Sequence, residues 1–343
     1  MTKIKDDASI LIILMGSIGD VVRGLSLLSP LKATYPRVRV TWLVETKCEA
    51  LVRMHENIDD VIVFEREKPL WGLIKLLSEL HRRTFDITLD MQRHFKSGLF
   101  SFFSGATRRI GFHWKNTKEG NWIFNNEKLP FVNDTLNKFH HYFKFLEHLG
   151  VKVENPSPII SNWKLESSPM AGSGEKNVGL VLSSSWESKN WPDEYYESLV
   201  TSILKVPETK VILIGDSSCK VLAERLVRLD QNGRIQDFSA KLNLSELAAL
   251  IGKLSVCVGP DSGPGHIAAA VNTSYIALFG PTSEKRTAPV GSKVKILRVE
   301  LPCAPCYRRK CPGLGQICMK GLKPDMVFET LRPYLMDIGS AKS

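Results

Sequence analysis

The feature that most constrains this chain is an alternation of short apolar runs with helix-period segments, which occurs twice along the sequence. Residues 9–15 (SILIILM) are continuously apolar, as expected of a strand buried on both faces of a parallel sheet. Apolar positions at helical spacing follow over 21–31, and further strand-like runs occur at 38–45, 60–64 and 85–89. This βαβ series predicts a parallel sheet covered by helices.

The alternation restarts in the second half of the chain. Pro192 followed by two acidic residues predicts a helix start, because Pro loses no needed N–H there and acids favour the positive end of a helix. Further strands are predicted at 178–182, 210–214, 235–238, 256–259 and 275–279.

A change of composition separates the two halves. Residues 155–174 are rich in Pro, Ser and Gly and lack periodicity, which is typical of a linker. We therefore predict an α/β chain of two Rossmann-like, doubly wound domains, at 1–160 and 175–343, with the last helix free to pack back on the N-terminal domain. Such folds bind ligands outside the carboxyl ends of their strands, so we expect the site in a cleft between the domains.

Charge and composition limit the function classes. The chain has 46 Lys and Arg residues against 36 Asp and Glu residues, and a net charge of +10 suits a polyanionic partner. No apolar run approaches the roughly 18–20 residues that span a bilayer. The N-terminus lacks a secretory cleavage site, so we expect a cytoplasmic protein whose seven cysteines are reduced.

The positive charge is concentrated between residues 91 and 150, where nine Lys and Arg residues face four acids. Two interpretations stay open for this segment: a solvated basic face, which is favoured, or a docking surface for an anionic acceptor. The helical run at 99–103 (LFSFF) likewise suits core packing or contact with a membrane interface. Nucleic acid is not expected as a partner, because the motifs of nucleic-acid-binding domains are absent.

The first candidate for a functional loop is 16–20 (GSIGD), between a predicted strand and a helix. Its glycines allow close backbone approach to an anion, but the G-x-G-x-x-G pattern of a dinucleotide site is missing. Asp20 is the informative residue, since an acid at a helix start repels a phosphate. From spacing alone Asp20 is a helix N-cap or a general base, with the cap favoured.

A second loop, 183–190, has hydroxyl groups and one lysine between a strand end and a helix start. Ser184, Ser185 and Lys189 predict a phosphate cradle, because hydroxyl donors, a positive charge and a helix N-terminus converge there. Hydroxyl-rich loops are common, so the pattern alone is of moderate specificity.

A third loop, 259–266, again joins a predicted strand to a helix. Gly263 frees the backbone so that N–H groups can surround an anion, and Asp261 can accept hydrogen bonds from sugar hydroxyls. The alternative is a Gly/Pro turn in which Asp261 or Ser262 caps the helix. Two such loops in one half favour a nucleotide-diphosphate site.

Four of the seven cysteines lie within 16 residues: Cys303, Cys306, Cys311 and Cys318. The first pair has C-x2-C spacing, but the full pattern is not that of a zinc ribbon. Free or packing thiols, a structural zinc or iron site, and disulfide or redox use all remain open, in that order of preference.

The loops, in this order, resemble glycosyltransferase family 9, which includes the lipopolysaccharide heptosyltransferases. The similarity covers most of the chain, and the ordered set of motifs is more specific than any single one. It comprises 18–21 (IGDV), 35–36 (YP), 40–44 (VTWLV), 85–92 (FDITLDMQ), 96–97 (KS), 104–106 (SGA), 109–112 (RIGF), 188–192 (SKNWP), 261–266 (DSGPGH) and 278–282 (LFGPT).

The resemblance implies a GT-B enzyme, with an N-terminal acceptor-binding domain and a C-terminal donor-binding domain that face each other across a cleft. It implies an inverting glycosyltransferase without a catalytic cofactor, which moves heptose from ADP-heptose to the lipid A-linked inner core of lipopolysaccharide. Because this acceptor is lipid-linked, the resemblance also implies that the protein binds peripherally to the inner leaflet of the cytoplasmic membrane. One branch of the family holds iron on C-terminal cysteines, which adds to the possible structural metal here.

The resemblance also implies roles for single residues. Asp20 matches the general base, which reverses the preference for a cap. Lys189 matches the lysine that offsets charge on the leaving diphosphate, and Asp261 matches a ligand of the donor sugar. Five further residues match contacts to the diphosphate: Ser184, Ser185, Ser262, Gly263 and His266.

Two other functions remain compatible with the residues. Another sugar-nucleotide transferase or a two-domain sugar-nucleotide epimerase would need the same donor loops. A nucleotide- or polyanion-binding module without catalysis would use the +10 charge alone. An epimerase acts on donor without acceptor, and that difference separates it from a transferase.

Overall fold

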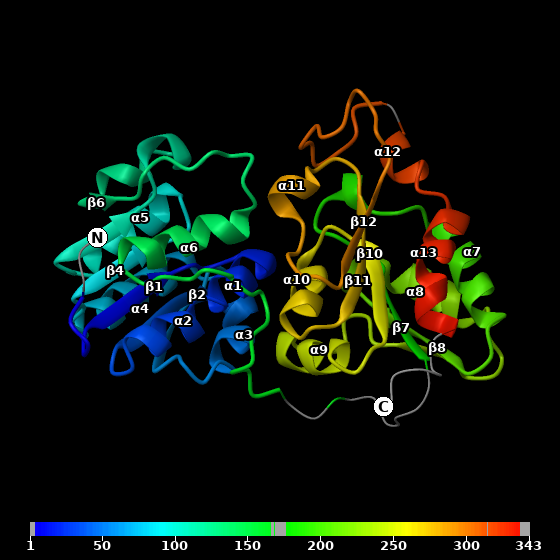
Figure 1. Cartoon of the computed structure of the whole chain (residues 1–343), viewed down its shortest axis with the longest axis horizontal. Helices are drawn as coiled ribbons and strands as arrows, with labels where there is room; N and C mark the ends of the chain where they lie inside the picture. Colours follow the sequence, from blue (N-terminus) through cyan, green and yellow to red (C-terminus); the bar gives the residue numbers. More distant parts are fainter. Residues whose placement is uncertain (1–3, 166–167, 169–175, 314, 337–343) are drawn as a thin grey trace. The chain divides into compact units, whose positions relative to one another are not determined.

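Two compact units make up the chain, which Figure 1 shows in sequence colours. The contacts divide it into Met1–Lys164 and Leu165–Ser343. The structure is a computed structural model that describes residues 4–165, 168, 176–313 and 315–336. The predicted linker falls partly outside these residues, at 166–167 and 169–174.

A parallel sheet of six described strands forms the centre of the first unit, in the order β3-β2-β1-β4-β5-β6. Helices cover both faces, so strand residues such as Ile10 and Leu11 are fully buried. The strands are β1 (Ser9–Ile13), β2 (Arg39–Glu45), β3 (Asp60–Phe64), β4 (Ile87–Asp90), β5 (Arg108–Gly111) and β6 (Glu127–Lys128).

The helices of this unit follow the strands in alternation. The helical segment expected over 21–31 is divided in two, because the Ser26 hydroxyl donates to the Arg23 carbonyl (2.7 Å) and a turn intervenes. The helices are α1 (Ile18–Leu25), α2 (Leu28–Thr34), α3 (Glu49–Arg53), α4 (Pro69–His81), α5 (Phe95–Phe103) and α6 (Lys138–His148), with 3₁₀ turns η1 (Thr46–Cys48), η2 (Trp114–Asn116) and η3 (Asn121–Ile123).

The second unit repeats the architecture around a parallel sheet of six described strands, in the order β12-β11-β10-β7-β8-β9. Its strands are β7 (Lys176–Val181), β8 (Thr209–Ile214), β9 (Ile235–Asp237), β10 (Val256–Pro260), β11 (Ser274–Phe279) and β12 (Val294–Arg298). Its helices are α7 (Asp193–Leu204), α8 (Lys220–Val227), α9 (Leu244–Ile251), α10 (Gly263–Ala270), α11 (Glu284–Thr287), α12 (Ile317–Lys320) and α13 (Pro324–Met336), with 3₁₀ turns η4 (Glu187–Lys189) and η5 (Ser217–Cys219).

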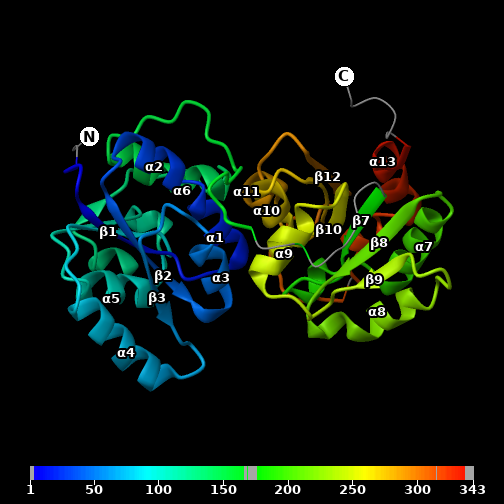
Figure 2. The ribbon, with the colours of Figure 1, turned by 90° about the horizontal axis from the view of Figure 1, so that it is seen from below.

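Helices lie on both faces of each sheet, as the view in Figure 2 shows. The predicted α/β class with two doubly wound sheets is therefore confirmed. The helix α13 packs against α7, and its buried residues Val327, Leu331 and Leu335 belong to the core of the second unit. The expectation that this helix also packs on the first unit stays a prediction.

The strand order reverses once in each sheet, between β1 and β4 and between β7 and β10. At such a point the connections leave on opposite sides of the sheet, and the loops at the carboxyl ends diverge. The segments that follow β1, β7 and β10 contain the predicted base and donor-binding residues, whereas the four predicted metal-ligating cysteines follow β12. No described helix is both long and apolar enough to cross a bilayer.

Candidate functional site

Asp20 lies in the first turn of α1, which begins directly after the loop that ends β1. The N-cap position belongs to Ser17, whose hydroxyl donates to Asp20 Oδ2 (3.1 Å) and makes no bond to the helix backbone. The N-cap interpretation of Asp20 is therefore wrong. The side chain of Asp20 is nearly buried, with 14% of its surface exposed, and its carboxylate is bonded by other side chains.

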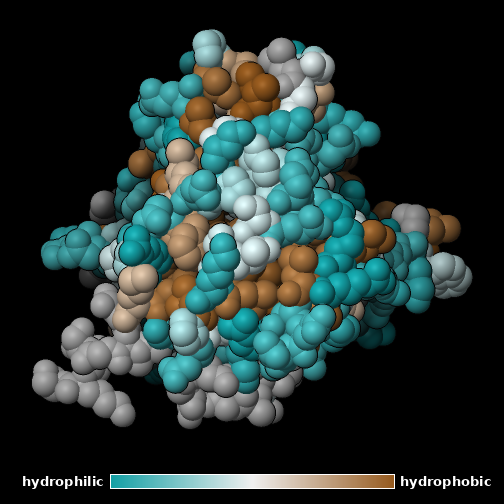
Figure 3. Space-filling view, turned by 90° about the vertical axis from the view of Figure 1, so that its right-hand side faces the viewer, coloured by the Kyte–Doolittle hydropathy of each residue, from teal (hydrophilic) through white to brown (hydrophobic). Residues whose placement is uncertain are grey.

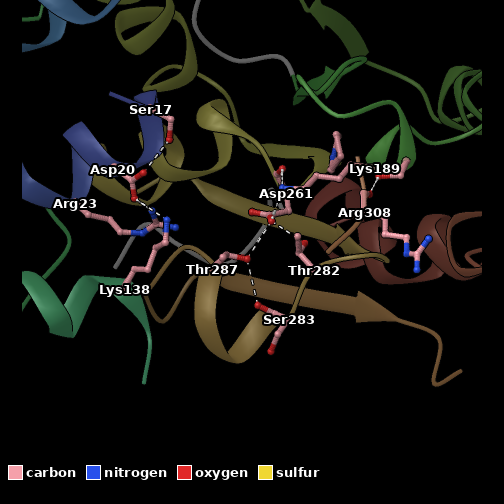
Figure 4. Close-up of polar contacts among 12 residues, drawn as sticks. Ser17, Asp20, Arg23, Lys138, Lys189, Asp261, Thr282, Ser283, Thr287 and Arg308 are labelled. Atoms are coloured by element: carbon pink, nitrogen blue, oxygen red, sulfur yellow. Dashed lines mark hydrogen bonds and ion pairs between the residues drawn. The ribbon is translucent and has the colours of Figure 1, made fainter. Parts of the chain in front are cut away.

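Two cations converge on the other oxygen of this carboxylate (Figure 4). Arg23 Nη1 donates to Asp20 Oδ1 at 2.9 Å, and Lys138 Nζ donates to the same atom at 3.3 Å. Burial by itself would raise the pKa of Asp20, but the attraction of Lys138 and Arg23 outweighs it and holds the pKa well below its usual range. Asp20 is therefore ionised at neutral pH.

The helix α6 packs against α1 and supplies part of the surroundings of Asp20. Besides Lys138, it provides the buried residues His141 and Tyr142. Arg93, which follows β4, has a left-handed backbone (φ 73°), and its Nη2 lies 2.5 Å from His141 Nδ1. Burial, and then the charge of Arg93, lower the pKa of His141 to about 4, so this imidazole is neutral at pH 7.

Gln92 connects the end of β4 to the loop before Asp20. Its Oε1 accepts hydrogen bonds from the backbone N–H groups of Met15 (2.8 Å) and Gly16 (3.3 Å). The backbone N–H of Gln92 in turn donates to the buried carboxylate of Asp90 (3.3 Å). The loop that positions Asp20 is thus attached to the neighbouring strand through side-chain hydrogen bonds.

In the second unit, Lys189 and Asp261 form a nearly buried ion pair. Lys189 Nζ donates to Asp261 Oδ2 at 2.8 Å and to the Asp261 carbonyl at 3.2 Å. The same carboxylate oxygen accepts hydrogen bonds from the hydroxyls of Thr282 (2.8 Å) and Thr287 (3.0 Å), as Figure 4 shows. Two residues predicted on separate loops are therefore in contact.

The remaining predicted donor residues belong to the same two chain segments as this pair, 183–190 and 259–266. Ser184 is half-buried, and its backbone N–H donates to the side chain of Asn190 (2.8 Å), while Ser185 is exposed. Ser262 occupies the N-cap position of α10, and its side chain makes no cap bond. Gly263 is the first residue of that helix, and His266 is buried within it. The first backbone N–H groups of α10 thus lie close to Asp261 in the chain, at the end of a helix that favours anions.

The four C-terminal cysteines line one cavity of about 230 Å³. Their exposure differs, since Cys303 and Cys306 are exposed and Cys318 is buried. Among the described residues, no three His, Cys, Asp or Glu side chains are arranged to hold a metal ion. Figure 3 shows apolar surface at the top of the second unit, over this segment.

The cysteine segment also supports the loop of Lys189. The Ser188 hydroxyl donates to the Arg308 carbonyl (2.6 Å), and the Ser188 N–H donates to the Arg309 carbonyl (3.1 Å). A third bond joins Gln316 Nε2 to the Glu187 carbonyl (3.1 Å). The position of η4, which includes Lys189, therefore depends on this segment.

Lys138 and Tyr142 were not predicted from the sequence as neighbours of Asp20. Lys138 is 118 positions away in the chain, and its charge alone does not distinguish it from the other lysines of the basic segment. A usable signal was present, since Lys138, His141 and Tyr142 share one face of a helix at spacing i, i+3, i+4.

Comparisons with known proteins give one consistent result. The model of glycosyltransferase family 9 (heptosyltransferase) matches residues 73–315. The lipopolysaccharide core heptosyltransferase OpsX of Haemophilus influenzae is 28% identical over 85% of this chain and 84% of its own length.

Two solved structures have the same fold at low identity. Escherichia coli heptosyltransferase WaaC with ADP-2-deoxy-2-fluoro heptose is 18% identical, with a TM-score of 0.78 over 95% of this chain and 99% of the other. The iron-containing dodecameric glycosyltransferase TibC of enterotoxigenic E. coli is 16% identical, with a TM-score of 0.61 over 97% and 77% of the two chains.

The contact between Lys138 and Asp20 leads to a prediction for the free protein. The substitution Lys138→Met removes one of the two cations on the carboxylate, so we expect the pKa of Asp20 to rise. Carboxyl-carbon NMR titration measures it. Lys144→Met is the matched control, because Lys144 lies on the same helix but pairs with Glu147. An unchanged Asp20 pKa in Lys138→Met would show that Arg23 alone determines it.

Proposed function

The chain belongs to glycosyltransferase family 9, and from this premise we propose that it transfers heptose from ADP-heptose to the inner core of lipopolysaccharide. The observation that supports this choice of substrates most strongly is the 28% identity to a lipopolysaccharide core heptosyltransferase over 85% of the chain. The GT-B fold, with two doubly wound parallel sheets, agrees with it.

In this proposal Asp20 is the general base. An acceptor hydroxyl attacks the anomeric carbon from the face opposite the diphosphate, the bond to the diphosphate breaks, and the hydroxyl proton passes to the Asp20 carboxylate. Lys138 and Arg23 keep Asp20 ionised but also make it a weak base. We therefore expect proton transfer late in the reaction, when the attacking oxygen has become acidic through its bond to carbon.

The donor site of the proposal lies in the second unit, around Lys189 and Asp261. Lys189 offsets the charge that grows on the departing diphosphate, and the N-terminus of α10 with Ser184 and Ser185 donates hydrogen bonds to it. Asp261 accepts hydrogen bonds from hydroxyls of the donor sugar. Thr282 and Thr287 hold its carboxylate in place through the hydrogen bonds already formed in the free protein.

The acceptor and the location of the protein follow from the same proposal. The inner core of lipopolysaccharide is attached to lipid A, so the enzyme works in the cytoplasm at the inner face of the membrane and binds it peripherally. The excess of basic over acidic residues between 91 and 150 supplies charge for a phosphorylated acceptor. The expectation that the protein does not bind nucleic acid stays a prediction.

Catalysis in this proposal uses no metal ion. A structural zinc or iron on Cys303, Cys306, Cys311 and Cys318 does not fit the arrangement of the described residues, although the four thiols share a cavity. We expect the purified protein to contain no stoichiometric metal and to show seven titratable thiols after unfolding without reductant. Elemental analysis and thiol titration measure both, and one zinc or iron per chain that disappears in Cys318→Ser would establish the metal site instead.

The role of Asp20 is tested by Asp20→Asn. The amide cannot accept the proton, so we expect turnover to fall by about 10²–10⁴-fold while donor affinity stays unchanged. Transfer to a truncated lipopolysaccharide core measures turnover, and incubation with donor alone identifies an epimerase. Glu147→Gln, on the exposed side of α6, serves as the control. Turnover near that of the wild type would eliminate Asp20 as the base.

The phosphate cradle, which would hold the diphosphate of the donor, is tested by Lys189→Ala. Loss of one charged hydrogen bond to the diphosphate weakens binding by about 10- to 100-fold. Isothermal titration calorimetry with ADP measures the affinity. Lys253→Ala removes an exposed lysine from the same unit and should bind ADP like the wild type. Equal ADP affinity for all three proteins would contradict the cradle.

A further inference from the structure

The outer side of α5 and η3 has an unusual concentration of exposed apolar side chains. Phe95, Phe102, Phe103, Trp122 and Ile123 are each between 41% and 66% exposed. Single exposed apolar residues are ordinary, but a contiguous group on one face indicates a binding partner. We call these five residues together with Phe124 the aromatic surface.

Ring contacts join the four phenylalanines of the aromatic surface. The ring of Phe124 lies 5.1 Å from that of Phe95 and 6.5 Å from that of Phe102, between centroids. Phe102 also lies 5.7 Å from Phe103. The two elements pack on each other, so these residues, which come from two segments of the chain, form one patch.

The exposed rings are not part of the hydrophobic core. On the opposite side of α5, Phe100 is fully buried and lies 5.5 Å from Phe64, between centroids. The prediction that the 99–103 run packs in the core is therefore confirmed for Phe100 and wrong for Phe102 and Phe103. Figure 2 shows α5 beside α4, on one face of the sheet of the first unit.

Basic side chains border the aromatic surface. The Arg109 guanidinium lies 5.6 Å from the centre of the Phe102 ring, and Lys128 Nζ lies 5.8 Å from that of Trp122. Lys118 is exposed in the segment before η3. Two acids lie nearby. Glu127 is paired with Arg108 through two hydrogen bonds, of 2.6 and 2.8 Å, and Glu119 contacts His94 (3.3 Å) and accepts a hydrogen bond from the Phe95 N–H (3.3 Å).

We propose that the aromatic surface docks on an anionic phospholipid bilayer. Aromatic rings prefer the membrane–water interface, and adjacent Lys and Arg residues are attracted to anionic headgroups. A second copy of this chain fits the surface less well, because a symmetric contact would bring the same basic border against itself. The inference deepens the proposed function, since it specifies the face through which the enzyme reaches a lipid-linked acceptor.

Vesicle co-sedimentation tests the proposal. We expect the protein to bind phosphatidylglycerol/phosphatidylcholine vesicles and to bind pure phosphatidylcholine vesicles much less. The double variant Phe102→Ser/Phe103→Ser should bind the anionic vesicles at least about tenfold more weakly, because it loses two rings that enter the interface. Val221→Ser, at an exposed apolar position of α8, should bind like the wild type.

A second variant keeps the rings and changes the charge. Lys118→Glu/Lys128→Glu should lose binding to the anionic vesicles while ADP affinity, measured by calorimetry, remains that of the wild type. Circular dichroism and the same ADP affinity establish that both double variants are folded.

Three results would overturn the docking surface: no wild-type binding to anionic vesicles, unchanged binding by the Phe102→Ser/Phe103→Ser variant, or a dimer in solution that this variant dissociates. Heptose transfer to a soluble truncated core is measured in parallel. Vesicle binding without transfer would leave the docking surface intact and remove the proposed function, whereas transfer without vesicle binding would do the reverse.

Discussion

The parallel pairing of the strands determines where this chain can perform chemistry. Every named strand of both sheets pairs in parallel, so all carboxyl ends of one sheet lie at the same edge. The order of strands reverses between β1 and β4 and between β7 and β10, and the loops at these reversals contain Asp20, Gln92, Lys189 and Asp261. Residues remote in sequence, such as Lys189 and Asp261, meet because the two strands before them are neighbours.

Each unit neutralises its candidate acid in the same way. Asp20 is paired with Lys138 and Arg23, and Asp261 is paired with Lys189. A carboxylate removed from water needs such partners, since an unpaired buried charge is strongly destabilising. Lys138 remains partly exposed, at 31% of its side chain, whereas Lys189, at 13%, is about as covered as Asp20, at 14%. The two pairs therefore differ in how open the lysine is to solvent.

The fold class and the loops that follow the central strands could be predicted from the sequence, because continuous apolar runs and turn residues are local signals. The sequence was not sufficient for β5, β6 and β12, whose residues alternate poorly and are partly exposed at or near the sheet edges. The contact of Lys138 with Asp20 was also missed. It depends on the packing of α6 against α1, which no local pattern encodes.

The basic excess between residues 91 and 150 has more than one structural role, which its composition alone did not reveal. Lys138 pairs with a buried carboxylate, and Arg108 pairs with Glu127. Arg109 and Lys128 instead border exposed aromatic rings. The basic residues of this segment therefore differ in their surroundings: some contact carboxylates, and others lie beside exposed rings of the aromatic surface.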